Sequence, residues 1–409
     1  EISECLVGSE MCIRDRMELV DLLSGKTLAE ADCTNSQTQF GANILDRILA
    51  VKENPDNLHT LQVLTLDDVR QMIERCCAQA GVSPEAVSAM TVGGNTTMLH
   101  FFLGCDPWQV FQSPYTPVFF DPGVLRASEL RLPIAGNIFC MPAIANYLGG
   151  DITSGLLMTD LDTREDLALF LDIGTNGEMA LGNESGALCC AVASGPAFEG
   201  AGISCGMPGI TGAVSHVSYD RGFLCDIVGG GEAKGICGSG LVDLVAVLLE
   251  RGVIDESGRL LPPQDAPEDM RRYLTGDGQG NGVFHLTKAV SLTARDVRNL
   301  QLAKAAVAGG IRVLLEQRGV TADNIASVEL AGGFGNYLSP ESAVRIGMLP
   351  RACLSKIRPL GNAALAGASM LALDGENWRK LAEIPEKCRY LELSGRDDFS
   401  RAFTDSLTF

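Results

Sequence analysis

Basic residues are scarce in this sequence, and they do not cluster. Among its 409 residues, 32 Lys and Arg stand against 51 Asp and Glu, which gives a net charge of −19. Surfaces that bind nucleic acid or anionic lipid normally carry runs of positive charge. We therefore expect neither a nucleic-acid partner nor a membrane partner.

Long apolar runs are missing too. No stretch reaches the roughly 18 to 20 apolar residues that span a bilayer, and the N-terminus lacks the basic-then-apolar order of a signal peptide. The chain is 46% hydrophobic and 20% charged, which is ordinary for a soluble protein of two or three domains. We interpret it as cytoplasmic.

Cysteine is plentiful, but the spacings that hold metals are absent. No C-x-x-C occurs among the 14 cysteines, and the adjacent pairs are Cys76–Cys77 and Cys189–Cys190. Zinc ribbons and iron–sulfur segments need repeated close spacings, which the four histidines do not supply either. We expect most thiols to be small core residues in a reducing compartment.

Two common nucleotide motifs are also absent. Neither the G-x-G-x-x-G of dinucleotide folds nor the G-x-x-x-x-G-K-[ST] phosphate loop is found in a suitable context. A nucleotide site, if present, must therefore use other glycine-rich turns.

The first sixteen residues, EISECLVGSEMCIRDR, show neither helical nor strand periodicity. They resemble the translation of sequencing-adapter DNA joined to a truncated reading frame; the alternative is a disordered native tail. We predict that they lie outside the fold. Residues 17–31 then begin in the middle of a domain, and the strand that should precede Met17 is missing.

The rest of the chain alternates between strand and helix patterns, which predicts an α/β fold. Residues 105–140, rich in proline and aromatics, are typical of an inserted loop-rich module with short strands. The predicted helices are 44–51, 65–80 with Thr65 as cap, 96–103, a helix after 235–240, and 293–318 with a Thr293–Asp296 capping box; the predicted strands are 87–92, 167–173 and 327–330.

One strand ends in a turn suited to phosphate, D-I-G-T-N-G-E at 172–178. Gly174 and Gly177 allow backbone N–H groups to face an anion and permit positive φ, and Thr175 adds a hydroxyl donor. Asp172 at the strand end can hold Mg²⁺. The alternative is a simple Asn-Gly β-hairpin without a ligand.

Three further glycine-rich junctions close a strand or open a helix, and two of them have a structural alternative. Residues 331–335 (AGGFG) can let a nucleoside lie against backbone, or can be a packed turn. Residues 235–240 (GICGSG) can offer amides to an anion, or Ser239 can simply cap the helix. Gly93-Gly94-Asn95 is the third.

Taken in order, four motifs resemble the C-terminal ATPase region of reductive activators of corrinoid proteins, which belongs to the acetate and sugar kinase, Hsp70 and actin superfamily. They are D-I-G-T-N-G-E at 172–178, A-S-G-P-A-F-E-G-A at 193–201, G-I-C-G-S-G at 235–240 and L-A-G-G-F-G-N at 330–336. The resemblance covers about residues 17–409. It implies two ribonuclease-H-like domains around a nucleotide cleft, at 17–165 and 166–409, that bind ATP and Mg²⁺.

The resemblance also implies roles for individual residues. Asp172 and Asp151 become the catalytic candidates, with Asp172 also the Mg²⁺ ligand. Asp151 stands where related ATPases place an acid that orients the attacking water, although it could merely cap a helix. The implied nucleotide-binding positions are Gly174, Thr175, Asn176, Gly177, Glu178, Gly195, Gly238, Ser239, Gly332, Gly333, Phe334 and Gly335.

In this family, ATP hydrolysis lets an electron reach a corrinoid cobalt and return it from Co(II) to Co(I). The implied partner is a corrinoid protein, and the implied assembly is a homodimer. The electron enters through an N-terminal [2Fe–2S] domain, which this sequence lacks together with the first phosphate hairpin. We expect such a truncated chain to bind ATP poorly and to carry no cluster.

Three other functions remain open from the sequence. A small-molecule kinase of the same superfamily would move phosphate to a sugar or carboxylate. An activator of 2-hydroxyacyl-CoA dehydratases would share a cluster across a dimer, for which Cys205 and Cys237 are the candidates. A binding module would have lost turnover altogether.

Overall fold

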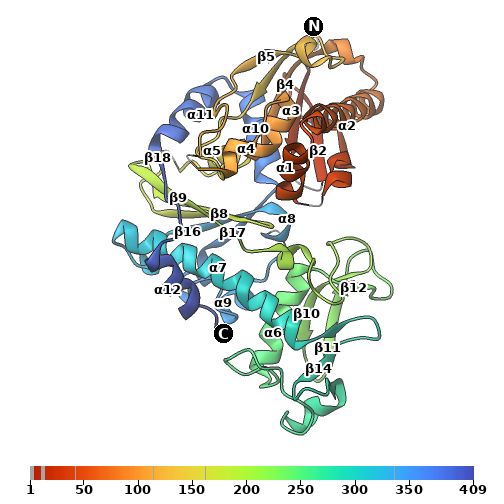
Figure 1. The fold of residues 1–409 in the computed structure, drawn as a ribbon, viewed down its shortest axis with the longest axis vertical. Coiled ribbons are helices and arrows are strands. Elements are labelled where there is room, and N and C mark those ends of the chain that lie inside the picture. The colour runs from red at the N-terminus through yellow and green to blue at the C-terminus, as the bar shows by residue number, and fades with distance from the viewer. Residues whose placement is uncertain (1–3, 11–13, 42, 114, 162, 336) are drawn as a thin grey trace. The chain divides into compact units, whose positions relative to one another are not determined.

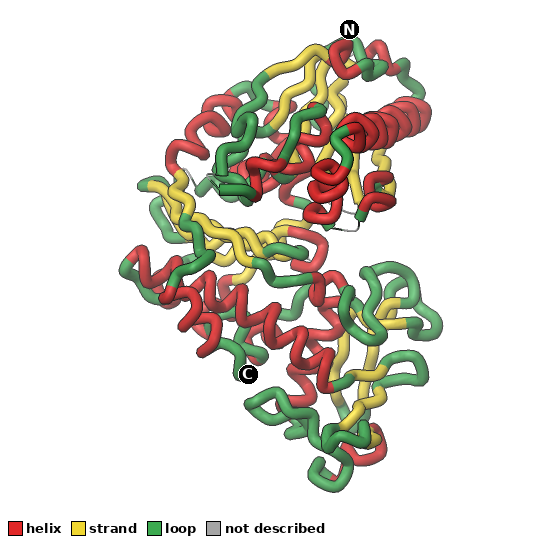
Figure 2. The backbone as a smooth tube through the Cα atoms, viewed as in Figure 1, coloured by secondary structure: helices red, strands yellow, loops and turns green. Residues whose placement is uncertain are grey.

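The computed structural model describes residues 4–10, 14–41, 43–113, 115–161, 163–335 and 337–409 (Figure 1). The chain divides into two compact units. Unit 1 comprises Glu1–Glu165, Asn183–Ala187 and Asn362–Tyr390, and unit 2 comprises Asp166–Gly182, Leu188–Gly361 and Leu391–Phe409. Helices and strands occur in both (Figure 2). None of the helices in the described part of the chain is long and apolar enough to cross a membrane.

Unit 1 is built on a sheet with the strand order β3-β2-β1-β4-β6-β5. The first three strands are antiparallel neighbours, whereas β4 is parallel to both β1 and β6. The strands are β1 (Glu4–Glu10), β2 (Arg14–Asp21), β3 (Thr27–Thr34), β4 (Val87–Gly94), β5 (Val124–Arg126) and β6 (Asn137–Cys140). The segment 105–140 thus supplies two strands of this sheet.

The structure contradicts the exclusion of residues 1–16 from the fold, for those of them that it describes. Strand β1 lies between β2 and β4, with Glu4 opposite Asp21 and Ser9 opposite Arg16. The strand position before Met17 is therefore filled. A strand can be held in a sheet by backbone hydrogen bonds to the strands on both sides of it. The periodicity of its side chains does not reveal these bonds. Residues 1–3 and 11–13 lie outside the described residues.

The helices of unit 1 are α1 (Ile44–Glu53), α2 (Asp56–Ala80), α3 (Thr96–Leu103), α4 (Trp108–Phe111), α5 (Gly150–Leu157), α10 (Ala363–Leu373) and α11 (Glu376–Lys387). Helix α2 begins at Asp56, so the prediction of Thr65 as its cap is wrong. Thr65 is buried inside the helix and its hydroxyl donates to the Leu61 carbonyl (3.2 Å). Asp68, three residues after Thr65, accepts two hydrogen bonds from Ser36.

Helix α10 belongs to unit 1, although the sequence predicts residues 362–390 in the second domain. The Thr91 hydroxyl of β4 donates to the Ala368 carbonyl (3.1 Å), and the Ser154 hydroxyl of α5 donates to the Ala364 carbonyl (2.5 Å). A Cβ at Gly367 would lie 1.9 Å from the Ser154 carbonyl oxygen, so glycine permits this close helix crossing. Sequence order cannot reveal that a late helix packs on an early sheet.

The main sheet of unit 2 contains, in order, β17-β16-β7-β8-β9. Strands β7 and β8 form an antiparallel hairpin, while β16 is parallel to both β7 and β17. The bounds are β7 (Ala168–Ile173), β8 (Gly177–Asn183), β9 (Gly186–Val192), β16 (Ser327–Ala331) and β17 (Ile357–Gly361). All five residues of β16 are buried, as a central strand requires.

Helices of unit 2 pack around this sheet and share one large apolar core. They are α6 (Gly238–Glu250), α7 (Ala294–Arg318), α8 (Gly332–Gly335), α9 (Pro340–Arg345) and α12 (Asp397–Asp405). The predicted capping box of α7 is confirmed, because Asp296 accepts from the Thr293 backbone (2.9 Å) and its own N–H reaches the Thr293 hydroxyl (3.3 Å). The other Asp296 oxygen accepts from Ser204 (2.8 Å), which fixes a loop against the helix start.

Two small sheets complete unit 2, and they come from the glycine-interrupted segments of the sequence. One has the order β11-β10-β12 and the other β13-β14-β15. Their strands are β10 (Ala213–Tyr219), β11 (Phe223–Ile227), β12 (Gly235–Ile236), β13 (Leu274–Gly276), β14 (Gly282–His285) and β15 (Ser291–Leu292).

Candidate functional site

The predicted phosphate turn is the tip of the β7–β8 hairpin. Asp172 pairs with Glu178 and Ile173 with Gly177, which leaves residues 174–176 as the turn, closed by the Gly174 N–H and the Asn176 carbonyl (2.8 Å). Asn176 is exposed, and Asp172 is partly exposed. The turn therefore presents its backbone and the Asp172 carboxylate at the end of the strands.

The glycines of this turn have a different role from the one predicted. Neither Gly174 nor Gly177 has a positive φ. Gly177 instead provides space, because a Cβ there would lie 3.0 Å from the Val192 side chain on β9. A Cβ at Gly174 would have the Glu199 Oε1 as its nearest neighbour, at 3.7 Å.

Two residues outside the predicted site hold the turn in place. The Ser194 hydroxyl lies within hydrogen-bond distance of the carbonyls of Gly174 (3.0 Å) and Thr175 (3.2 Å), and the Thr175 hydroxyl donates to the Glu199 carboxylate. Both belong to the A-S-G-P-A-F-E-G-A motif, of which only Gly195 was selected. Gly195 itself has φ +75°, and no atom of the described residues lies within 4 Å of its Cβ position.

The glycine turn after β16 lies directly beside Asp172. Ala331 pairs with Asp172, and a Cβ at Gly332 would lie 2.7 Å from the Asp172 Oδ1. Gly332 also has φ +84°, a conformation that favours glycine. The structure thus brings together the acid of one predicted motif and the glycines of another.

The neighbouring residues of this turn differ in what they touch. Gly333 has open space at its Cβ position, whereas Gly335 packs on Leu330. The Phe334 ring packs against Phe198, with ring centroids 4.7 Å apart. Asn336, the last residue of the fourth motif, lies outside the described residues.

The start of α6 is tightly packed. A Cβ at Gly238 would lie 1.9 Å from the Phe198 carbonyl oxygen, and the buried Ser239 hydroxyl donates to the Ser215 carbonyl (2.8 Å). Ser239 is not the N-cap of this helix. The N-cap is Cys237, whose side chain makes no capping hydrogen bond. The Cys237 thiol is buried against the Val214 carbonyl (3.4 Å), a position that does not suit a cluster shared across a dimer surface.

Asp151 lies in unit 1, at the second position of α5. Gly149 is the N-cap of that helix, and Asp151 accepts from the Ile152 N–H (2.9 Å). A Cβ at Gly149 would lie 2.5 Å from the Asn95 Cα, so the start of this helix lies next to the predicted Gly93-Gly94-Asn95 junction. Desolvation raises the pKa of Asp151 from 3.8 to about 6. Perturbed carboxyl groups of this kind are frequent at catalytic positions.

The hairpin, the adjoining glycine turn and the α/β sheets define a nucleotide-binding protein of the actin, Hsp70 and sugar kinase class. The family model described as the C-terminal domain of RACo, the ASKHA domain, matches residues 166–409, and the model of the RACo middle region matches residues 15–164. The chain belongs to this family of reductive activators of corrinoid proteins.

Individual relatives agree with the family models. The corrinoid activation enzyme RamQ of Eubacterium limosum is 31% identical over 404 residues, which cover 96% of this chain and 68% of the relative. The [Co(II) methylated amine-specific corrinoid protein] reductase of Methanosarcina barkeri is 26% identical, and the match covers 96% of this chain and 75% of the relative.

A solved structure of a reductive activator for corrinoid, iron-sulfur protein matches with a TM-score of 0.88 and 36% identity. The match covers 100% of this chain and 66% of the solved chain. This chain therefore spans about two thirds of the length of the proteins it resembles.

Proposed function

We propose that this chain is the nucleotide-binding part of an ATP-driven reductase that returns the cobalt of a corrinoid protein from Co(II) to Co(I). The observation that carries the proposal is the contact of the Asp172 carboxylate with the glycine turn at Gly332, at the tip of the β7–β8 hairpin. An acid between a phosphate turn and a nucleoside turn lies where a nucleotide and its metal ion would meet. The names of the two curated relatives support the corrinoid substrate.

The donor set at the hairpin suits Mg²⁺, which prefers oxygen ligands and keeps several waters. In the proposal Asp172 holds the ion, which would neutralise phosphate charge when bound. The backbone of residues 174–177 binds phosphate, with Ser194 and Glu199 keeping the turn in shape. Gly195, Gly238 and Ser239 flank the phosphates, and Gly332, Gly333, Phe334 and Gly335 lie along the nucleoside.

Asp151 is proposed to orient and deprotonate the attacking water, for which a pKa near neutrality is suitable. Because its pKa is raised to about 6, Asp151 is ionised above that pH and protonated below it. We expect ATP hydrolysis to fall about tenfold per pH unit below about pH 6. Steady-state phosphate release between pH 4.5 and 8 measures this. The Asp151→Asn variant should be slow at every pH and lack this step; an unchanged profile in the variant would exclude the role.

The reduction of each cobalt consumes one electron. ATP contributes no atom to the reduced product, because water hydrolyses it to ADP and phosphate. Hydrolysis contributes by biasing a two-state conformational equilibrium by a few kcal/mol. The electron is proposed to come from a [2Fe–2S] domain of the kind that precedes this region in the family. We further propose a homodimer and a cytoplasmic location.

The function is tested by supplying the electron chemically. The chain is mixed with ATP at saturating concentration, because we expect weak binding, together with Mg²⁺, titanium(III) citrate and a Co(II) corrinoid protein. Co(I) is followed by its absorbance. We expect Co(I) only when ATP is present, and phosphate release that the Co(II) protein stimulates and the Co(I) protein does not. Phosphate transfer to a sugar or carboxylate would make the protein a kinase instead. No phosphate release and no nucleotide binding would leave a module without turnover.

A further inference from the structure

Unit 2 contains a cavity of about 580 Å³ that none of the predicted site residues lines. It is bounded by β10 and β11, by the second half of α6 and by the start of α9. Its volume is typical of pockets for small molecules. Its polar lining includes His216, Ser218, Asp226, Asp243, Ser339 and Ser342.

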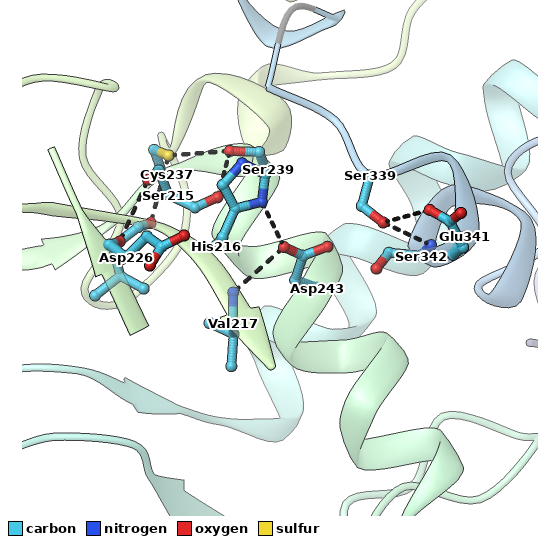
Figure 3. A network of polar contacts seen from close by, with 11 residues as sticks. Ser215, His216, Val217, Asp226, Cys237, Ser239, Asp243, Ser339, Glu341 and Ser342 are labelled. Atoms are coloured by element: carbon cyan, nitrogen blue, oxygen red, sulfur yellow. Dashed lines mark hydrogen bonds and ion pairs between the residues drawn. The ribbon is translucent and has the colours of Figure 1, made fainter. Parts of the chain in front are cut away.

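Asp243 is the distinctive residue of this cavity, because its carboxylate is buried and only one of its oxygens is used. Its Oδ2 accepts from the His216 Nδ1 (3.0 Å) and from the Val217 N–H (3.3 Å) (Figure 3). No donor in the described part of the chain reaches Oδ1, although that atom is buried. Buried carboxylate oxygens are normally satisfied. Oδ1 is therefore an acceptor suited to an N–H or O–H group of a ligand.

The cavity continues along the elements that carry the proposed nucleotide site. Asp243 follows Ser239 by one turn of α6, about 6 Å along the helix axis, and Ser339 follows the glycine turn of residues 332–335 on the way to α9. The Ser239 hydroxyl also binds the carbonyl of Ser215, the residue before His216. The cavity therefore lies within about one helical turn of residues of the proposed nucleotide site.

We propose that the cavity receives the base of the nucleotide, and that Asp243 selects adenine by accepting a hydrogen bond from its exocyclic amine. This inference rests on the proposed function. Adenine presents an N–H donor at its position 6, whereas guanine and hypoxanthine present a carbonyl oxygen there. A carbonyl facing the Asp243 carboxylate would pair acceptor with acceptor. His216 and the Val217 N–H act as positioning groups, since they occupy Oδ2 and leave Oδ1 for the base.

Ligand-observed NMR titrations of the whole chain test the inference with ATP, ITP and dATP, because such titrations measure weak binding without turnover. ITP carries a carbonyl in place of the amine, and dATP lacks only the 2′-hydroxyl. We expect ITP to bind about 10- to 100-fold more weakly than ATP, the usual value of a hydrogen bond to a charged group, and dATP to bind like ATP.

The Asp243→Asn variant keeps an oxygen for His216 and Val217 but replaces Oδ1 by an amide donor. We expect its preference for ATP over ITP to disappear or reverse. The matched control is Asp220→Asn, an exposed residue of the β10–β11 turn, which loses the same charge outside the cavity and should keep the wild-type preference.

The outcomes separate this inference from the proposed function. Equal binding of ATP and ITP by the wild-type chain overturns the base-reading role while the nucleotide site stands. A loss of dATP binding without a loss of ITP binding also overturns it, since the buried oxygen would then read the sugar. An equal change in both variants would assign the effect to charge alone and overturn it too. No binding of any nucleotide overturns the proposed function itself.

Discussion

Replacing Asp172 with Asn is expected to slow ATP hydrolysis by at least about 100-fold, which corresponds to about 2.7 kcal/mol of activation free energy. The substitution keeps the size of the side chain at the end of β7 but removes the charge that would hold Mg²⁺. Because Asp172 is partly exposed, we expect the fold to survive. Phosphate release measures the rate, and thermal unfolding with circular dichroism measures the fold.

The control for this experiment is Asp166→Asn, an exposed acid that precedes the same strand. It should hydrolyse ATP at the wild-type rate. Nucleotide titrations with and without Mg²⁺ give a second measurement that does not depend on turnover: the Mg²⁺-dependent gain in affinity should vanish in Asp172→Asn. Normal turnover in that variant would overturn the assignment of the hairpin.

The second large effect is expected at Gly332, where a methyl group would act on both stability and binding. Gly332→Ala places a Cβ 2.7 Å from the Asp172 Oδ1 and requires an alanine at φ +84°. The backbone conformation alone costs about 1–2 kcal/mol, and relief of the contact must move Asp172. We expect a lower free energy of unfolding, measured in urea, and loss of ATP binding.

The neighbouring glycine offers a matched comparison. Gly333 has no positive φ, and a Cβ there would meet no atom of the described residues, so Gly333→Ala should leave the free energy of unfolding close to that of the wild type. If a nucleoside lies on this turn, however, the same methyl group should weaken ATP binding. A Gly333→Ala variant that binds ATP as tightly as the wild type would place the nucleoside elsewhere.

The sequence predicted those parts of the molecule that depend on local patterns. Strand β7, helix α7 with its capping box and the hairpin turn at Asp172 can be recognised because neighbouring residues encode them. The family could likewise be recognised from four motifs in order, and the family models agree with it. The nucleotide-binding roles of the motif residues stay predictions.

The features that the sequence did not reveal depend on distant parts of the chain. Glu199 and Ser194 hold the phosphate turn through hydrogen bonds to residues that lie 24 and 20 positions earlier in the sequence. Strand β1 was missed because its hydrogen bonds to β2 and β4, and not a side-chain period, give it a place in the sheet. The pairing of His216 with Asp243 joins β10 to α6, and neither residue belongs to a short motif.

The place of α10 has a consequence for how the protein is made on the ribosome. Unit 1 includes residues 362–390, so the part of its sheet that α10 covers lacks this helix until most of unit 2 has been synthesised. At translation rates of about 5–20 residues per second, the nascent first unit must wait roughly 10 to 45 s for its last helices. During that interval the face of β4 that α10 later covers is available to chaperones, and the two units must mature together.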